Sequence, residues 1–189
     1  MHLKNVNNCS SLRRQFRRGT LQGGVLSPLL WNVVVNKLLT ELEEKGCRVI
    51  AYADDIVITA TGRFPDTVRD LVQGSLNDLT IWSEKCGLSI NPQKTESIVF
   101  IKKQKIPHIK PLKINGVSIP FVEETRYLGL ILDRKLTWKA NIICRVKKAS
   151  TALYVCKNMV AKKWGLSPKI THWIYTAVVR PILTYGCII

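Results

Sequence analysis

Two adjacent carboxylates, Asp54 and Asp55, lie between two strongly apolar segments, and this pattern constrains the fold more than any other in the chain. The flanking segments 49–53 and 56–58 have the composition of β-strands. Charge is costly to bury, so we expect the aspartates at the turn of a β-hairpin over residues 48–60. Asp is common at hairpin turns, which is the simpler explanation of the pair. The alternative is a metal site, because adjacent carboxylates can hold a hard cation such as Mg²⁺.

Helical spacing of apolar residues recurs elsewhere. The expected helices span residues 26–45, 65–86, 137–161 and 167–180. Ser27 is a good N-cap with Pro28 in the first turn, Ser167 and Pro168 repeat that arrangement, and Pro181 should end the last helix.

Strand patterns follow the second expected helix. Residues 97–101 and 127–132 read as strands, the latter broken by Gly129. Asn115-Gly116 between two short apolar segments predicts a type I′ hairpin. The order of elements predicts an α+β fold, with helices and strands up to about residue 134 and a basic helical region after it.

The chain is strongly basic, and its basic residues are unevenly distributed. It holds 29 Lys and Arg against 13 Asp and Glu, a formal net charge of +16. Residues 134–189 contain 11 basic residues and no acidic one, residues 1–21 contain no acidic one, and a third basic run spans 102–113. A solvated face would explain one such run. For all three together we expect contact with phosphates, with nucleic acid ahead of a membrane surface as the partner.

Composition argues against several other classes of protein. Mean hydropathy is +0.04, and no apolar run approaches the roughly 20 residues of a membrane span. Residues 1–11 lack the apolar region of a secretory signal, so we expect an intracellular protein of the cytoplasm or nucleus. The six Cys and three His are scattered, so neither a zinc site nor a disulfide framework is expected.

A second motif, Gln22-Gly23-Gly24 followed by Ser27-Pro28, precedes the first expected helix. Two glycines let the backbone approach a ligand closely, and the amide of Gln22 can hydrogen-bond a base or sugar edge. Taken alone, a simple helix entry is the better explanation of this motif.

The succession of four motifs changes that interpretation. The motifs are Gln22–Pro28, Tyr52–Asp55, Asn91–Glu96 and Tyr127–Gly129. In order and spacing they closely resemble the reverse transcriptase domain of non-LTR (LINE-type) retrotransposons, over residues 19–189. The resemblance implies an RNA-directed DNA polymerase, a nucleotidyltransferase whose partners are an RNA template, a DNA primer and deoxynucleoside triphosphates. It implies a two-metal Mg²⁺ site and no small-molecule cofactor.

The resemblance also assigns roles to the first two motifs. Asp54 and Asp55 match the catalytic motif that binds the two Mg²⁺ ions at a palm hairpin. Tyr52 and Ala53 match positions under the primer terminus and the incoming nucleotide. The turn that positions template and nucleotide matches Gln22, Gly23 and Gly24.

Two later motifs match parts of the same active centre. Lys94 matches a lysine thought to assist pyrophosphate departure, as a proton donor or a charge partner. A solvated lysine ahead of a strand is the alternative. Tyr127, Leu128 and Gly129 match the primer-grip hairpin at the palm–thumb junction, with simple strand packing as the alternative.

The basic helices match the thumb, which follows the template–primer backbone. The residues expected to contact that backbone are Lys139, Arg145, Lys147, Lys148, Lys157, Lys162 and Lys163. Trp138, Trp164 and Trp173 could stack on bases, but at helical spacing in an apolar set we expect them in the core. Nothing in the sequence assigns a role to Tyr185.

The resemblance divides the chain into three parts. Residues 1–21 form a basic lead-in, poorly ordered or a lone strand, residues 22–134 a partial palm, and residues 135–189 the thumb. Leu21 stands where the family often has Pro, and no earlier palm carboxylate precedes Gln22. We therefore expect the C-terminal part of a reverse transcriptase, inactive by itself because the fingers and the first metal ligand are absent. A group II intron-type reverse transcriptase and a non-catalytic nucleic-acid-binding remnant are the alternatives, although Leu183–Gly186 resembles the non-LTR kind more.

Overall fold

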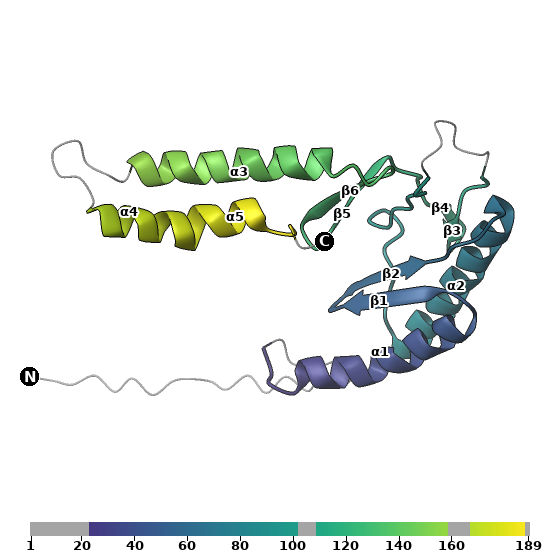
Figure 1. Cartoon of the computed structure of the whole chain (residues 1–189). Coiled ribbons are helices and arrows are strands. Elements are labelled where there is room, and N and C mark those ends of the chain that lie inside the picture. Colours follow the sequence, from purple (N-terminus) through teal and green to yellow (C-terminus); the bar gives the residue numbers. More distant parts are fainter. Residues whose placement is uncertain (1–22, 102–108, 159–166, 188–189) are drawn as a thin grey trace, which may run out of the picture. The chain divides into compact units, whose positions relative to one another are not determined.

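The computed structural model describes residues 23–101, 109–158 and 167–187 (Figure 1). The lead-in predicted for residues 1–21 lies outside these ranges, as do Gln22, Lys162, Lys163 and Trp164. The chain divides into two compact units, Met1–Thr61 and Gly62–Ile189.

The first unit consists of one helix and one hairpin. Helix α1 spans Ser27–Glu44, close to the predicted 26–45, and has proline in its first turn. Leu26 occupies the N-cap position without a side-chain cap, so the predicted Ser27 cap is wrong: Ser27 is already helical. The buried residues Val35, Leu38 and Leu42 follow a three- and four-residue spacing and form the face that packs on β1.

The predicted hairpin over 48–60 is confirmed. Strand β1 spans Arg48–Tyr52 and pairs antiparallel with β2, Asp55–Thr59, in a register that joins Tyr52 to Asp55. Val49 of β1 and Cys47, directly before it, are buried. The register therefore leaves only Ala53 and Asp54 in the turn.

The second unit begins with helix α2, Pro65–Cys86, which matches the prediction. Gly87 ends it in the left-handed conformation, which glycine adopts without steric cost. Strands β3, Lys113–Ile114, and β4, Val117–Ser118, form the predicted hairpin, and both turn residues, Asn115 and Gly116, have positive φ as a type I′ turn requires. The Gln73 side chain of α2 bonds both backbone groups of Lys113, at 2.9 and 2.8 Å, and holds this hairpin on the helix.

Two strand predictions need correction. Residues 97–101 form only an isolated bridge, in which Ser97 pairs with Phe121. Residues 127–132 are not one strand. Strand β5 spans Glu124–Tyr127 and β6 spans Leu130–Asp133, and they pair as a hairpin around Leu128 and Gly129. Gly129 does not interrupt a strand; its positive φ reverses the chain.

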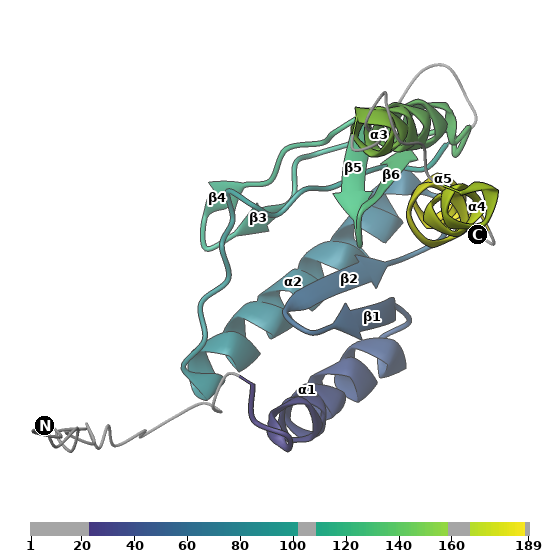
Figure 2. The same ribbon diagram turned by 90° about the vertical axis from the view of Figure 1, so that its left-hand side faces the viewer.

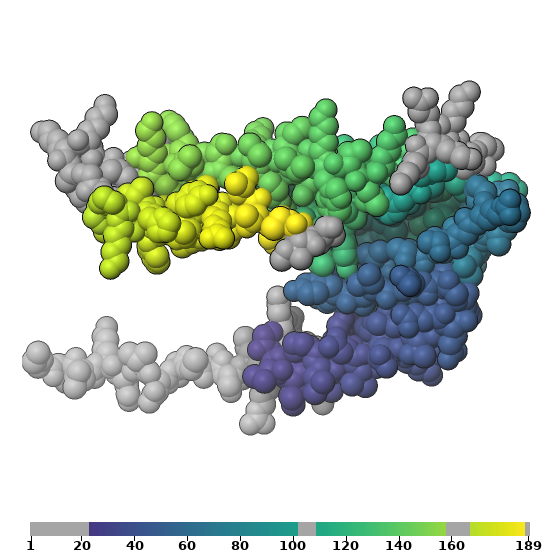
Figure 3. Space-filling view, viewed as in Figure 1, coloured from purple at the N-terminus to yellow at the C-terminus, as the bar shows by residue number. Residues whose placement is uncertain are grey.

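The C-terminal region is helical, as predicted. Helix α3 spans Lys139–Asn158, α4 spans Pro168–Ile174, the π-helical segment η1 spans Tyr175–Val179, and α5 spans Arg180–Thr184. Ser167 caps α4 as expected, its Oγ accepting from the Ile170 N–H at 3.4 Å. Pro181 does not end the helix, because α5 continues directly from η1 and holds Pro181 in its first turn. Segment α4–α5 runs alongside α3 (Figures 2 and 3).

These elements make a mixed helix and strand fold, consistent with the predicted α+β class. Within the described residues the strands form separate two-stranded antiparallel sheets. None of the helices described is both long and apolar enough to cross a membrane.

Candidate functional site

The turn between β1 and β2 presents the two aspartates to solvent. Asp54 is the second turn residue, Asp55 is the first residue of β2, and both are exposed. Ala53 adopts a φ of +51°, in the left-handed region that non-glycine residues seldom enter. An unusual backbone conformation of this kind costs on the order of 1–3 kcal/mol and needs support from its surroundings.

Trp31 of α1 supplies part of that support. Its indole Nε1 donates to the Ala53 carbonyl oxygen at 2.6 Å. Because α1 packs on β1, the helix that follows Gln22-Gly23-Gly24 (the glycine motif) also fixes the turn that carries the aspartates. The sequence gives no signal for this bond, since Trp31 reads as one more apolar residue of the helix.

Carboxylate oxygens are the donor type that Mg²⁺ prefers, and it is often held by one or two carboxylates together with substrate phosphates. Asp54 and Asp55 provide that donor set on an accessible turn. Among the described residues no group of three or more His, Cys, Asp or Glu could hold a metal ion. The residues present therefore fit a cation that completes its shell with water or substrate oxygens.

The glycine motif enters α1 through a turn. Gly23 has a φ of +82° with open space where a side chain would be, and the Ser27 N–H donates to the Gly24 carbonyl at 3.1 Å. Gly23 thus provides exposed backbone, as the sequence predicts for a ligand-approaching turn.

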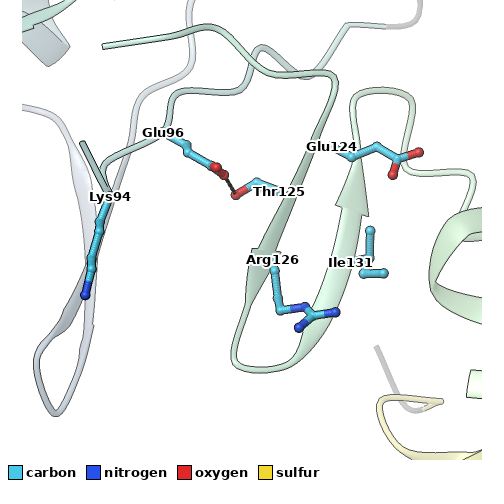
Figure 4. A pocket seen from close by; sticks show the side chains of 6 residues that line it. All are labelled: Lys94, Glu96, Glu124, Thr125, Arg126 and Ile131. Atoms are coloured by element: carbon cyan, nitrogen blue, oxygen red, sulfur yellow. Dashed lines mark hydrogen bonds between the residues drawn. The ribbon is translucent and has the colours of Figure 1, made fainter. Parts of the chain in front are cut away.

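Lys94 lies on a turn after α2 that Asn91 organises. The Asn91 side-chain oxygen accepts from the Gln93 N–H at 3.0 Å, and the Asn91 backbone carbonyl accepts from the Thr95 hydroxyl at 2.9 Å. Lys94 borders an open pocket of about 420 Å³ (Figure 4). The other lining residues are Glu96, Glu124, Thr125, Arg126 and Ile131. The Thr125 hydroxyl donates to Glu96 at 2.8 Å, which joins the Lys94 segment to β5.

The turn between β5 and β6 is a second left-handed turn. Leu128 has a φ of +45° and Gly129 one of +80°, the combination of a type I′ turn. Asn or Asp would be usual where Leu128 stands. The turn carbonyls of Leu128 and Gly129 accept hydrogen bonds from Tyr185 and Arg145.

Helix α3 presents its lysines to solvent. Lys139, Lys147, Lys148 and Lys157 are exposed, as an electrostatic contact with phosphates requires. Arg145 differs, because it is buried and directed at the β5–β6 turn.

The tryptophan predictions have mixed outcomes. Trp138 is partly buried just before α3. Trp173 on α4 is 67 % exposed, so its predicted place in the core is wrong. An exposed indole on a basic segment is available for stacking.

The structure groups the predicted residues by unit. Gly23, Gly24 and the 52–55 turn belong to the first unit, within which Trp31 connects the helix to the turn. Lys94, the 127–129 turn and the basic helices belong to the second unit, within which β5 lies beside Lys94 and α3 bonds the turn.

Comparison with known proteins gives consistent results. Residues 1–132 match the family described as reverse transcriptase (RNA-dependent DNA polymerase). The chain is 27% identical over 186 residues to a Drosophila melanogaster protein named "Probable RNA-directed DNA polymerase from transposon BS", covering 96% of this chain and 20% of that protein. It is 28% identical over 186 residues to the "RNA-directed DNA polymerase from mobile element jockey" of Drosophila funebris, with 96% and 20% covered.

A third relative is the "Retrovirus-related Pol polyprotein from type-1 retrotransposable element R1" of Nasonia vitripennis, 27% identical over 172 residues, covering 89% of this chain and 51% of that protein. The chain thus spans between one fifth and about one half of the length of these relatives. No solved structure matches the chain.

Proposed function

Because the chain belongs to the reverse transcriptase (RNA-dependent DNA polymerase) family, we propose that it carries part of the active centre of an RNA-directed DNA polymerase from a non-LTR retrotransposon. The observation that carries the proposal is the exposed Asp54-Asp55 turn, held by Trp31 of the helix that follows the glycine motif. Residues 22–134 would then belong to the palm and residues 135–189 to the thumb. The relatives named for R1, jockey and transposon BS support this choice over an intron-encoded enzyme.

Asp54 and Asp55 would hold Mg²⁺ through their carboxylate oxygens. Bound Mg²⁺ would supply charge neutralisation for the attacking and leaving oxygens of nucleotidyl transfer. The aspartates would present their carboxylates from a restrained backbone, because Trp31 bonds the carbonyl of Ala53, the turn residue next to Asp54. Tyr52 and Ala53 on the same turn would lie beneath the primer terminus and the nucleotide.

The backbone at Gly23 and Gly24 would approach the template or nucleotide, with Gln22 adjacent in sequence. Only glycine combines the positive φ of Gly23 with an absent side chain. Lys94 would provide a cation for the departing pyrophosphate. Its exposed position at an open pocket leaves its ammonium group accessible to such a ligand.

The second unit would bind the RNA–DNA duplex. The turn at Tyr127, Leu128 and Gly129 would contact the primer end, and the exposed lysines of α3 would contact backbone phosphates, with Lys162 and Lys163 adding charge. Phosphate contacts are sequence-independent and release counterions, so the affinity should fall steeply with salt.

Salt-dependent binding of an RNA–DNA duplex tests the basic helix. Lys147→Ala/Lys148→Ala should lower the slope of log affinity against log salt by roughly 1 for each lost phosphate contact. The charge-matched control is Lys37→Ala/Lys85→Ala, which removes two exposed lysines from α1 and α2 and should leave the slope unchanged. Equal slopes for all three proteins would contradict a role for α3.

Primer extension tests the catalytic part. With two carboxylates at one turn and no larger ligand group in the described residues, we expect no measurable synthesis by this chain alone. Robust synthesis in Mg²⁺ that disappears in Asp54→Ala would overturn the expected inactivity and support the catalytic assignment. Binding of duplex without any metal binding at Asp54 and Asp55 would favour the non-catalytic alternative.

A further inference from the structure

The β5–β6 turn and the segment after α5 are 57 positions apart in sequence but meet in the structure. The Tyr185 hydroxyl donates to the Leu128 carbonyl at 2.7 Å, and Arg145 Nη2 donates to the Gly129 carbonyl. The central carbonyls of a two-residue hairpin turn have no partner in the strand ladder. Here both of them are bound by side chains from the helical region.

The two donors also hold each other. The Arg145 guanidinium carbon lies 4.3 Å from the centre of the Tyr185 ring, within the range of a cation–π contact. Arg145 is 9% exposed, and its Nε has no hydrogen-bond partner, so its orientation is set by the ring and the Gly129 carbonyl. A buried guanidinium aimed at one turn is poorly placed to bind a phosphate.

Two further contacts fix the same region. Asn141, one helical turn before Arg145, accepts from the Ile131 N–H at 3.3 Å and is itself buried. Gly186 has a φ of +77° and lies so close to Leu130 that a Cβ there would overlap the leucine side chain. The hairpin is therefore docked on both α3 and the Tyr185-Gly186 segment.

Leu128 is the residue that all of this support holds in place. It is a bulky residue at a positive φ, a position where a small polar residue is usual, and the residue is 37% exposed. Backbone strain that the surrounding contacts over-determine is a recognised feature of functional segments.

We infer that Arg145 and Tyr185 are positioning residues, which hold the Leu128-Gly129 turn so that the Leu128 side chain meets the end of the primer strand. This inference rests on the proposed role of the turn at the primer. It assigns Tyr185 a function and moves Arg145 from phosphate contact to support of the turn.

The test uses the full chain with an RNA–DNA duplex that carries 2-aminopurine at the primer's 3′ terminus. Fluorescence of this base reports contact at the primer end, and anisotropy of a dye at the far end reports overall affinity. Tyr185→Phe removes only the hydroxyl and keeps the ring beneath Arg145. Arg145→Lys keeps the charge and loses the planar donor.

At saturating protein, Tyr185→Phe should lower the ratio of complexes with the bound terminal signal to complexes without it by about fivefold, which corresponds to one net hydrogen bond. Overall affinity should change by less than about twofold, because the exposed lysines are untouched. Tyr175→Phe, an exposed tyrosine in η1 of the same segment, is the matched control and should behave as wild type.

The outcomes separate the inference from the proposed function. If the wild-type chain binds duplex without changing the terminal signal, the primer-end role of the turn is wrong and the inference falls with it. If the terminal signal changes on binding of the wild type, and changes by the same amount with Tyr185→Phe and with Arg145→Lys, only the inference is wrong. If Arg145→Lys fails to fold, the test relies on Tyr185→Phe together with hydrogen exchange over residues 127–130. If both the exchange and the terminal signal of Tyr185→Phe equal those of the wild type, the inference is wrong.

Discussion

The two hairpin turns with proposed functions are the 53–54 turn (the first turn) and the 128–129 turn (the second turn). Both are held by side-chain hydrogen bonds to their carbonyls, but the second turn has more of these bonds. Each places a non-glycine residue, Ala53 or Leu128, at positive φ. Each has the carbonyl of that residue bound by an aromatic side chain, Trp31 in one case and Tyr185 in the other. The 128–129 turn adds a buried arginine on the neighbouring carbonyl.

The difference follows from what each turn presents. The 53–54 turn presents carboxylates, and a bound cation would itself add binding energy and fix their geometry. The 128–129 turn presents an uncharged leucine, so the protein must supply all of the ordering. Preorganisation by the protein is therefore most needed where the ligand contributes least.

The largest expected effect is on metal binding by the first turn. Asp54→Asn/Asp55→Asn should abolish Mn²⁺ binding, measured by electron paramagnetic resonance. Mn²⁺ can stand in for Mg²⁺ because both ions bind carboxylate oxygens. Asp66→Asn removes one exposed carboxylate of α2 and should leave binding unchanged. If the double variant binds Mn²⁺ as well as the wild type does, the aspartates do not hold the ion, and no bound cation would order the first turn.

The next effect concerns the packing that supports the second turn. Gly186→Ala should lower the free energy of unfolding by about 3 kcal/mol, from the left-handed strain and the overlap with Leu130 together. Gly116→Ala is the control, because its φ of +78° is nearly the same and nothing lies within 4 Å of an added Cβ. It should cost about 1 kcal/mol.

Urea denaturation measures both variants. If the two substitutions have equal costs, close packing of Gly186 on Leu130 contributes nothing beyond backbone conformation. The second turn would then depend on its hydrogen-bonded contacts, chiefly those of Tyr185 and Arg145.

Much of this architecture could be predicted from local pattern. The 48–60 hairpin, the α2 boundaries and the Asn115-Gly116 turn depend on neighbouring residues, and all three are confirmed. The local pattern does not predict the reverse turn at Leu128, because leucine is unusual at positive φ and the segment looks like one strand with a glycine in it. Only the resemblance of Tyr127, Leu128 and Gly129 to the primer-grip hairpin implies a hairpin there.

Side-chain bonds over long sequence separations were the least predictable. Trp31 and Tyr185 donate to carbonyls 22 and 57 positions away, and neither residue type signals a partner of that kind. The continuation of the last helix to Thr184 was also not predicted, because a proline such as Pro181 usually marks the end of a helix. The site residues keep their predicted roles as proposals, with Arg145 given a different one.

A smaller effect is expected from the single aromatic bond of the first turn. Trp31→Phe keeps an aromatic side chain and removes the bond to the Ala53 carbonyl, so it should cost about 1 kcal/mol. Ala53→Gly in the same background should recover part of the loss, because glycine tolerates the positive φ of +51°. Denaturation of the two single variants and of the double variant tests this. If the double variant loses as much free energy of unfolding as the two single variants together, the bond does not support the conformation of the turn.

The smallest effect is a pH dependence of the contacts that support the second turn. Asp133 ends β6 and accepts from the Thr137 N–H at 2.9 Å, the Thr137 hydroxyl at 3.0 Å and the Trp138 N–H at 2.9 Å, which fixes the chain before α3 and Arg145. The bond from the Thr137 N–H contributes most to lowering the pKa of Asp133 below its ordinary 3.8, and partial burial opposes it.

A carboxyl whose pKa is lower in the folded state stabilises the fold above its unfolded-state pKa and loses that contribution as the pH falls through the folded value. The stability difference between wild type and Asp133→Asn, measured by urea denaturation from about pH 6 to pH 2, should therefore shrink as acid is added. Hydrogen exchange should show residues 127–130 opening more readily in acid, whereas Asp133→Asn shows less of this dependence. A constant difference across the range would mean that ionised Asp133 does not support the second turn, and that its helix-side contacts hold it without help from charge.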